Sequence, residues 1–573
     1  MESHSVAVPT RRPAFWLSAL LDAAVGSHRR ACAFLVAVCL LAFLPGFFQI
    51  PPVDRDEARF AQATKQMVES GDFVDIRFQD EVRYKKPVGI YWLQSVAVEA
   101  GRLLGVANAD TTIWLYRLPS LGGAISGVLL SYWAALAFVG RRAALLTALM
   151  MAGSLVLGVE ARLAKTDAVL LACSVAAMGA MARIYLTQRR APDTATGWPL
   201  PAILWTAIAA GVLVKGPLIL MFVGLTAITL SIADRSARWI WRLRPFSGVL
   251  WMLLLVLPWF IAIALRSGGS FFEQAIGHDM LAKVASNQEA HGAPPGYYVL
   301  LFWLTFWPGS VLAGLAAPAV WRMRREPATQ FLLAWLVPSW LVFEAVITKL
   351  PHYVLPLYPA VAILIAGVVE KGALVDARWL VRGTVGWFVF PGLIAVALPV
   401  IFVMVGHDLG IIAWPFAAVA VIFGLFAWWL YDVDGPEAAL LRGTVASVFV
   451  AVTVYAVMLP SLPSLFPSAQ IADTVSAAGC ADPQVASTAY YQEPSLVFLA
   501  GTGTRFTDGA GAAQFLNGGP CRFALIDAHS ERNFVQRADA IGLRYALSAR
   551  IDGFNFSIGK PVALTVFRST GAP

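Results

Sequence analysis

The chain has 573 residues, of which 58% are hydrophobic and 14% charged, whereas soluble domains carry about 25% charged residues. Apolar runs of about 20 residues recur along most of it, which excludes a soluble globular protein and predicts a polytopic α-helical membrane protein. The net charge of +8 lies in short loops and favours contact with anionic lipid over nucleic acid.

The N-terminal region predicts a retained first helix and not a signal peptide. It contains Arg11, Arg12, Arg29 and Arg30, and no small-residue cleavage site follows the first apolar run. Fourteen apolar segments are candidates for membrane helices: 31–49, 88–105, 113–139, 143–160, 166–186, 200–214, 216–232, 246–265, 297–321, 328–348, 354–370, 382–406, 410–431 and 440–460.

Basic loops orient these segments, because short cytoplasmic loops are rich in Lys and Arg. Every segment except 88–105 fits a simple alternation between such loops. That segment is short and contains Gln94, Glu99 and Arg102, so we expect it to lie along the external interface. Thirteen spanning helices, a cytoplasmic N-terminus and an external C-terminus follow, with a membrane domain over 1–460 and external loops at 50–112 and 266–296.

The first external loop has the densest group of charges near the start of the chain. A helix from Asp56 would place Asp56, Arg59 and Phe60 on one face. A carboxylate beside a guanidinium suits a site that handles a phosphate and a proton. Helix capping by Asp54 or Asp56 is the alternative, but it does not account for Glu57 as well.

The same topology brings other charged residues to the external side. Tyr84, Lys85 and Lys86 precede an apolar segment, where they could anchor a solvated loop or bind a phosphate. Asp167 ends a run of four charges between two apolar segments and could cap a helix or supply a second carboxylate. Lys215 stands in a tight turn that snorkelling explains as well as ligand binding does.

Two further external stretches complete this set. The loop 266–296 contains His278 and Lys283 among several acids; His278 could bind a metal such as zinc, although the spacing matches no standard motif. The stretch from Lys349 through His352 and Tyr353 to Pro359 is broken by prolines, which membrane proteins tolerate where backbone lines a cavity. No cofactor is clearly required by these patterns.

Residues 461–573 are polar and predict a small mixed α/β domain outside the membrane. Strand-like runs occur at 497–499, 522–526 and 562–566, between Gly-rich turns. Cys480 and Cys521 both lie here, and a disulfide between them is one outcome if the compartment is oxidising. The sequence has no Walker loop, which argues against ATP-driven transport.

Three motifs in this order resemble the bacterial 4-amino-4-deoxy-L-arabinose lipid A transferases, within the GT-C group of glycosyltransferases that includes protein O-mannosyltransferases. They are Asp56-Glu-Ala-Arg59-Phe60, Tyr84-Lys85-Lys86-Pro87 before Tyr91-Trp92, and Lys349-Leu-Pro-His-Tyr353-x-x-Pro356-x-x-Pro359. The resemblance covers the whole architecture. It implies transfer of aminoarabinose from undecaprenyl phosphate to a lipid A phosphate at the periplasmic face of the inner membrane, which lowers polymyxin affinity.

By matching position, the resemblance makes Asp56 the catalytic carboxylate, with Asp167 a second external acid. Arg59 and Lys86 would bind phosphate, and Tyr353 would line the cavity. Tyr84, Lys85 and Lys349 are further candidates for phosphate binding, and Glu57, His278, Lys283 and His352 for the substrate cavity. Lys85 departs from the family, where an acid is often present, and this weakens the case for a metal ligand there.

Two other functions are consistent with the residues. One is a GT-C enzyme that uses another polyprenyl-phosphate sugar or a protein acceptor. The other is a transporter that binds polyprenyl phosphate without catalysis. In every case the expected partners are the lipid bilayer and a polyprenyl-phosphate lipid, and a monomer is expected.

Overall fold

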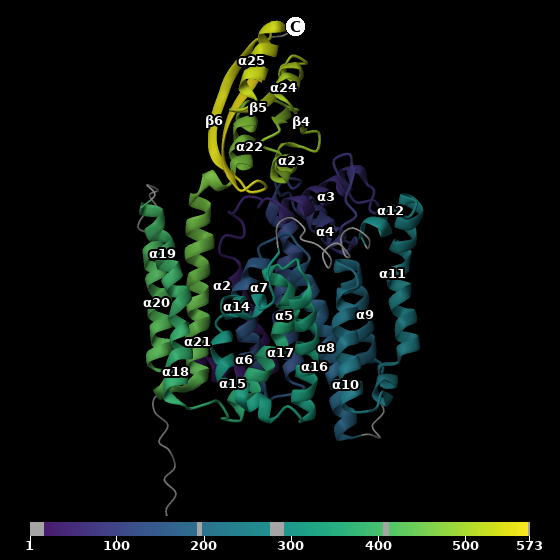
Figure 1. Ribbon diagram of the computed structural model, residues 1–573, viewed down its shortest axis with the longest axis vertical. Coiled ribbons are helices and arrows are strands. Elements are labelled where there is room, and N and C mark those ends of the chain that lie inside the picture. Colours follow the sequence, from purple (N-terminus) through teal and green to yellow (C-terminus); the bar gives the residue numbers. More distant parts are fainter. Residues whose placement is uncertain (1–15, 192–196, 276–291, 405–411, 571–573) are drawn as a thin grey trace, which may run out of the picture.

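A helical bundle carries a smaller α/β domain at one end in the computed structural model (Figure 1), which describes residues 16–191, 197–275, 292–404 and 412–570. The first part of the bundle contains α1 Trp16–Val25, α2 His28–Phe43, α3 Asp56–Ser70, α4 Gly89–Leu103, α5 Ile113–Ala135, α6 Arg141–Gly153, α7 Leu155–Glu160, α8 Asp167–Arg190, α9 Pro199–Lys215, α10 Leu218–Ala233, α11 Pro245–Ser267 and α12 Ser270–Phe272. A short hairpin, β1 Arg77–Phe78 and β2 Glu81–Val82, lies between α3 and α4.

The second part of the bundle contains α14 Tyr297–Thr305, α15 Ser310–Arg322, α16 Pro327–Ala345, α17 Tyr358–Glu370, α18 Arg378–Val385, α19 Phe390–Met404, α20 Ala413–Trp429 and α21 Tyr431–Ala451. Short helical turns join them: η1 Arg238–Leu243, η3 Pro351–Leu357, η4 Gly386–Val389, η5 Val452–Met458, η6 Leu459–Ser461 and η7 Pro463–Leu465. Prolines interrupt α16 and η3.

Seven helices in the described part of the chain are long and apolar enough to cross a membrane: 113–135, 167–190, 245–267, 327–345, 351–370, 378–404 and 431–461. Shorter apolar helices cover 199–215, 218–233 and 413–429. The predicted fold class is therefore confirmed, while the count of thirteen spanning helices stays a prediction. With 15 residues, α4 is shorter than the roughly 20 that a membrane helix needs.

The C-terminal domain is a mixed sheet with helices packed against it. It contains α22 Pro467–Ala477, β3 Gln484–Thr488, α23 Pro494–Ala500, β4 Arg505–Thr507, α24 Gly509–Leu516, β5 Arg522–Asp527, α25 Glu531–Ala540, β6 Tyr545–Asn555 and β7 Lys560–Ser569. The strand order is β4-β3-β5-β7-β6. Strands β4, β3 and β5 are parallel, and β7 is antiparallel to both of its neighbours.

The predicted strands at 522–526 and 562–566 are confirmed as parts of β5 and β7. The predicted strand at 497–499 is wrong, because these residues belong to the helix α23. Short apolar runs fit a buried helix as well as a strand, and here Pro494 in the first helical turn favours the helix. Cys480 and Cys521 form a disulfide with a Cα–Cα distance of 5.8 Å, joining the loop after α22 to the start of β5.

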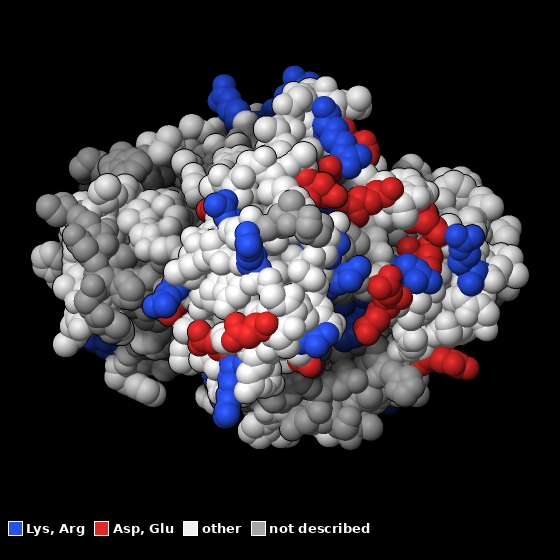
Figure 2. Space-filling view, turned by 90° about the horizontal axis from the view of Figure 1, so that it is seen from above, with Lys and Arg blue, Asp and Glu red and all other residues white. Residues whose placement is uncertain are grey.

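Helices α3 and α4 lie between the bundle and the C-terminal domain (Figure 1). On the α3 side, Lys65 Nζ donates to the carbonyl of Phe498 at 2.9 Å and Gln62 Nε2 donates to Thr502 Oγ1 at 2.8 Å. The Phe498 ring also packs on Tyr116 of α5, with centroids 5.1 Å apart. The C-terminal domain is thus docked on α3, the helix that begins at Asp56. From this end, positive and negative side chains are interspersed over the centre of the molecule (Figure 2).

Candidate functional site

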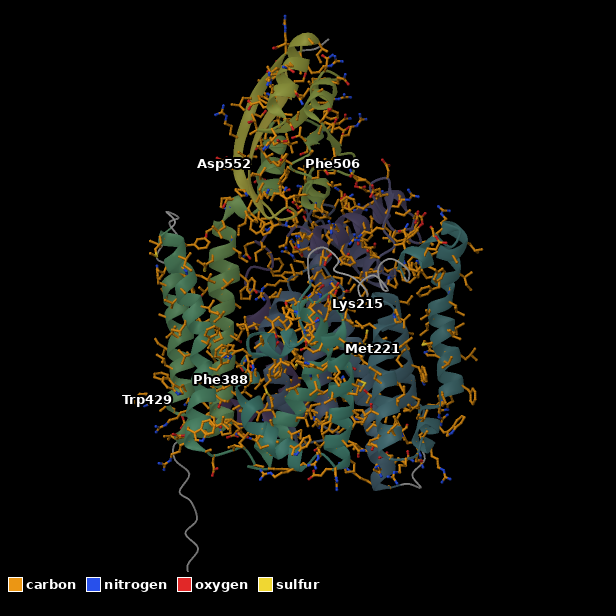
Figure 3. The ribbon with its side chains drawn as sticks, viewed as in Figure 1. Lys215, Met221, Phe388, Trp429, Phe506 and Asp552 are labelled. Atoms are coloured by element: carbon orange, nitrogen blue, oxygen red, sulfur yellow. A yellow bond between two sulfur atoms is a disulfide. The ribbon has the colours of Figure 1, made fainter. Side chains whose placement is uncertain are left out.

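Five charged or titratable side chains, from four helical elements and one loop, meet at the end of the bundle that faces the C-terminal domain. We call this set the inner cluster: Glu160 at the end of α7, Lys165 in the following loop, Asp167 at the start of α8, Lys215 at the end of α9 and His352 in η3. Figure 3 shows Lys215 at this end of the helices, below α3 and α4.

Contacts within the inner cluster alternate in charge. Glu160 Oε1 lies 3.1 Å from Lys165 Nζ and 3.4 Å from His352 Nδ1. The other imidazole nitrogen, Nε2, lies 3.6 Å from Asp167 Oδ1, which also accepts a hydrogen bond from Lys215 Nζ. The Lys215 ammonium is 5.3 Å from the centre of the Tyr353 ring. The Lys349–Pro359 motif therefore places His352 beside Asp167 and Tyr353 beside Lys215.

Hydrogen-bonding capacity is left over at Glu160. The side chain is buried, and its second oxygen, Oε2, has no hydrogen-bond partner among the described residues. Buried carboxylate oxygens are seldom left unsatisfied, because desolvating them costs free energy. An unsatisfied acceptor inside a charged cluster indicates a place where a ligand donor can bind.

Asp56 belongs to the electrostatic surroundings of this cluster. Burial disfavours the charged form of Lys165, but Glu160, Asp167 and Asp56 together raise its pKa above the usual value. Burial likewise raises the pKa of Tyr91 in α4, and the Asp56 carboxylate acts in the same direction. Asp56 itself is exposed at the first position of α3. The solvent-exposed Asp56 carboxylate thus acts electrostatically on the buried Lys165 ammonium.

The backbone just before Asp56 is strained. Arg55 is the N-cap of α3 and has φ of 71°, a value that residues other than glycine seldom adopt. Such a conformation costs on the order of 1–3 kcal/mol and often marks functional sites. The capping alternative for the acids is not observed, since no side chain caps α3 and Asp54 accepts instead from the backbone N–H of Ser495 at 2.9 Å.

Glu57, expected in the substrate cavity, is instead part of a closed ion pair. Its two oxygens lie 2.8 and 2.9 Å from Arg117 Nε and Nη2, and they also accept from the backbone N–H groups of Val53 and Ala164. Arg117 gives its other hydrogen bonds to three carbonyls, of Phe47, Ile50 and Pro51. Glu57 follows Asp56 by about 100° around the helix, so it points into the core.

The candidate phosphate binders fall into two groups, side chains that are buried and hydrogen-bonded within the protein and side chains that are at least partly exposed. Tyr84 is buried, and its hydroxyl donates to Asp75 Oδ1 at 2.6 Å, so this side chain holds the hairpin loop and is not available to a phosphate in this arrangement. Lys349 is also buried and donates to the carbonyl of Val346 at the end of α16. Arg59 and Lys86 are half-buried and Lys85 is exposed.

The predicted metal ligand His278 and the cavity residue Lys283 lie outside the described residues. Within the described ranges, no group of three or more His, Cys, Asp or Glu side chains could hold a metal ion. Our sequence prediction named His352, Asp167 and Tyr353 but left out Glu160, Lys165 and Lys215 as site residues. Glu160 and Lys165 could have been recognised from the sequence, because they belong to the run of four charges from Glu160 to Asp167 between apolar segments.

Comparisons with known proteins relate the chain to lipid-phosphate-dependent glycosyltransferases. Residues 34–268 match the family model of dolichyl-phosphate-mannose-protein mannosyltransferases. Relatives described as undecaprenyl phosphate-α-4-amino-4-deoxy-L-arabinose arabinosyl transferases include one from Edwardsiella ictaluri, 28% identical over 59% of each chain, and one from Yersinia pestis, 27% identical over 54% of each. This chain therefore aligns with a little over half the length of those relatives.

The fold is that of a solved transferase. The structure of ArnT from Cupriavidus metallidurans bound to undecaprenyl phosphate superposes with a TM-score of 0.73 and 19% identity, covering 93% of this chain and 97% of that one. Its apo state gives a TM-score of 0.70 at 20% identity. The fold expected from the three motifs is thereby confirmed over nearly the whole chain.

Proposed function

We propose that this chain transfers 4-amino-4-deoxy-L-arabinose from undecaprenyl phosphate to a phosphate of lipid A, at the periplasmic face of the bacterial inner membrane. The observation that carries the proposal is the inner cluster, in which lysines, carboxylates and a histidine from four helical elements and one loop converge. The names of the relatives and the ArnT fold support the same donor lipid.

The reaction needs two things that these residues supply. The bond between the sugar anomeric carbon and the undecaprenyl phosphate oxygen breaks, and a lipid A phosphate oxygen forms the new bond to that carbon. Lys215, together with the motif cations Lys86 and Arg59, would stabilise the negative charge that grows on the departing phosphate. A lipid A phosphate is already anionic near neutral pH, so no strong general base is required.

The carboxylates suit the sugar side of the reaction. Asp56 would orient the acceptor or stabilise positive charge at the anomeric carbon as the bond breaks. The unsatisfied Glu160 Oε2 would accept from the amine or a hydroxyl of the sugar. Direct attack of the lipid A phosphate on the anomeric carbon would be an inverting displacement. No step here depends on a metal, and a divalent metal at His278 stays a prediction.

Mass spectrometry of lipid A tests the proposal in a host that makes the donor but lacks its own transferase. Wild type is expected to add aminoarabinose to lipid A, and Asp56→Asn to add none at equal protein level. Asp80→Asn is the matched control, because Asp80 is an exposed acid in the same external loop and should leave transfer unchanged. Unmodified lipid A with wild type would contradict the proposal and favour another sugar or a protein acceptor.

A further inference from the structure

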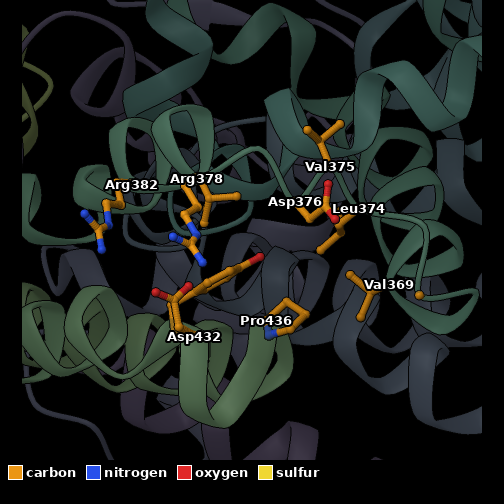
Figure 4. A pocket seen from close by; sticks show the side chains of 11 residues that line it. Val369, Leu374, Val375, Asp376, Arg378, Arg382, Asp432 and Pro436 are labelled. Carbon is orange, nitrogen blue, oxygen red and sulfur yellow. The ribbon is translucent and has the colours of Figure 1, made fainter.

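A cavity lies at the end of the bundle opposite to the inner cluster. It has a volume of about 320 Å³ and is enclosed by the end of α17, the following loop, α18 and the start of α21. Figure 4 shows its lining, and Figure 1 places α18 at the end of the bundle away from the C-terminal domain. Nothing in the proposed transfer reaction uses this cavity.

Charges of both signs line this cavity. Arg378 and Arg382 come from α18 at i and i+4, so they lie on one side of that helix. Asp376 and Asp432 come from the loop before α18 and from α21. Within the described residues none of these four side chains has a hydrogen-bond or ion-pair partner, although Arg378 extends toward Asp432 (Figure 4).

The surroundings place the cavity at the level of lipid head groups. Trp379, next to Arg378, is 78% exposed, and Trp429, at the end of α20, is 77% exposed. Exposed tryptophans at helix ends are typical of the boundary between hydrocarbon and head groups. Figure 3 shows Trp429 at the same lower edge of the bundle. The cavity wall between the charges is apolar, formed by Val369, Leu374 and Val381.

From this arrangement we infer that the α18 cavity binds the head group of a phospholipid with a phosphate and a primary ammonium, the phosphoethanolamine type. The arginine pair would hold the phosphate, and Asp432 with Asp376 would accept from the ammonium. An anionic head group without an amine would set its charge against two carboxylates. A choline head group has no N–H to donate.

Native mass spectrometry of the purified full chain, titrated with defined phospholipids, tests the inference. Phosphatidylethanolamine is expected to bind at least about tenfold more tightly than phosphatidylglycerol or phosphatidylcholine, a difference of about 1.4 kcal/mol. Arg378→Gln with Arg382→Gln should remove this tight binding. Arg322→Gln with Arg325→Gln is the matched control at the same end of the bundle and should leave it intact.

Asp432→Asn separates recognition of the ammonium from recognition of the phosphate. This variant should lose the preference for ethanolamine over glycerol head groups while still binding a phospholipid. Equal binding of all three lipids by wild type would overturn the inference without any variant. Tight binding of phosphatidylethanolamine that survives in the double arginine variant would also overturn it, because the phosphate would then be held elsewhere.

Discussion

Glu57 and Glu160 are buried to the same degree, each with 2% of the residue surface exposed, yet their surroundings differ. Both oxygens of Glu57 are saturated by Arg117 and by backbone N–H groups. Glu160 shares one oxygen between Lys165 and His352 and leaves the other unsatisfied. Burial is therefore the same for the two acids, and they differ in unused hydrogen-bonding capacity.

The two sites also differ in what they connect. The Glu57–Arg117 pair fixes the loop before α3 to α5 and to the backbone near Ala164. The inner cluster joins helix ends and draws in the motif residues His352 and Tyr353. The first arrangement holds the loop before α3 in place, and the second gathers charges of both signs at the helix ends.

The largest effect is expected from Glu57→Gln. Removing one charge from a buried, fully bonded pair leaves Arg117 uncompensated, which costs about 3–5 kcal/mol of stability. Size-exclusion chromatography and thermal unfolding of the detergent-solubilised protein should show little folded material. A Glu57→Gln variant as stable as wild type would contradict the structural role assigned to Glu57.

Glu160→Gln should lower transfer activity much more than it lowers stability. The amide keeps the size of the side chain but not its charge, so we expect transfer to fall about 100-fold while thermal stability changes far less than in Glu57→Gln. Lipid A modification, normalised to folded protein, gives the readout. A loss of stability as large as that of Glu57→Gln would assign Glu160 to the structure as well.

Lys215→Gln tests whether the cation beside Asp167 binds the donor phosphate. We expect kcat/KM for the donor lipid to fall about tenfold or more, because a charge-assisted contact to phosphate is lost. Lys371→Gln serves as control, since Lys371 pairs with Glu326 on the surface and is remote from the cluster. Unchanged donor kinetics in Lys215→Gln would place the phosphate elsewhere.

The smallest effect concerns the contact of the C-terminal domain with Asp54. Burial, together with the nearby Glu493 carboxylate, raises the pKa of Asp54 from 3.8 to about 7. The folded state therefore keeps a proton that the unfolded state releases, so this contribution to stability is lost as pH rises from about 4 through 7. Amide protection factors in α3 and α23, which correct for the intrinsic pH dependence of exchange, should be lower at pH 8 than at pH 6.

Asp54→Asn is expected to flatten that pH dependence, because the amide does not titrate in this range. Glu493 accepts from Ser557 and stays buried, so its own contacts remain in the variant. An equally steep pH dependence in Asp54→Asn would show that another group controls the docking.

Only part of the site could be predicted from the sequence: Asp167 and His352 of the inner cluster were named, whereas Glu160, Lys165 and Lys215 were not. The helix begins at Asp56 as predicted, and the proline-broken stretch after Lys349 brings His352 and Tyr353 inward. The contrast between Asp56 and Glu57 could not be read, since it depends on Arg117, which is 60 residues away within an apolar helix. Lys215 was ambiguous because a lone lysine at a helix end is explained equally well by snorkelling.

A structure with undecaprenyl phosphate bound tests the central claim most directly. We expect the lipid phosphate within about 3 Å of Lys215 Nζ, the distance of a charge-assisted hydrogen bond, with the Glu57–Arg117 pair unchanged. A phosphate bound away from the inner cluster, with Lys215 still paired only to Asp167, would contradict the account.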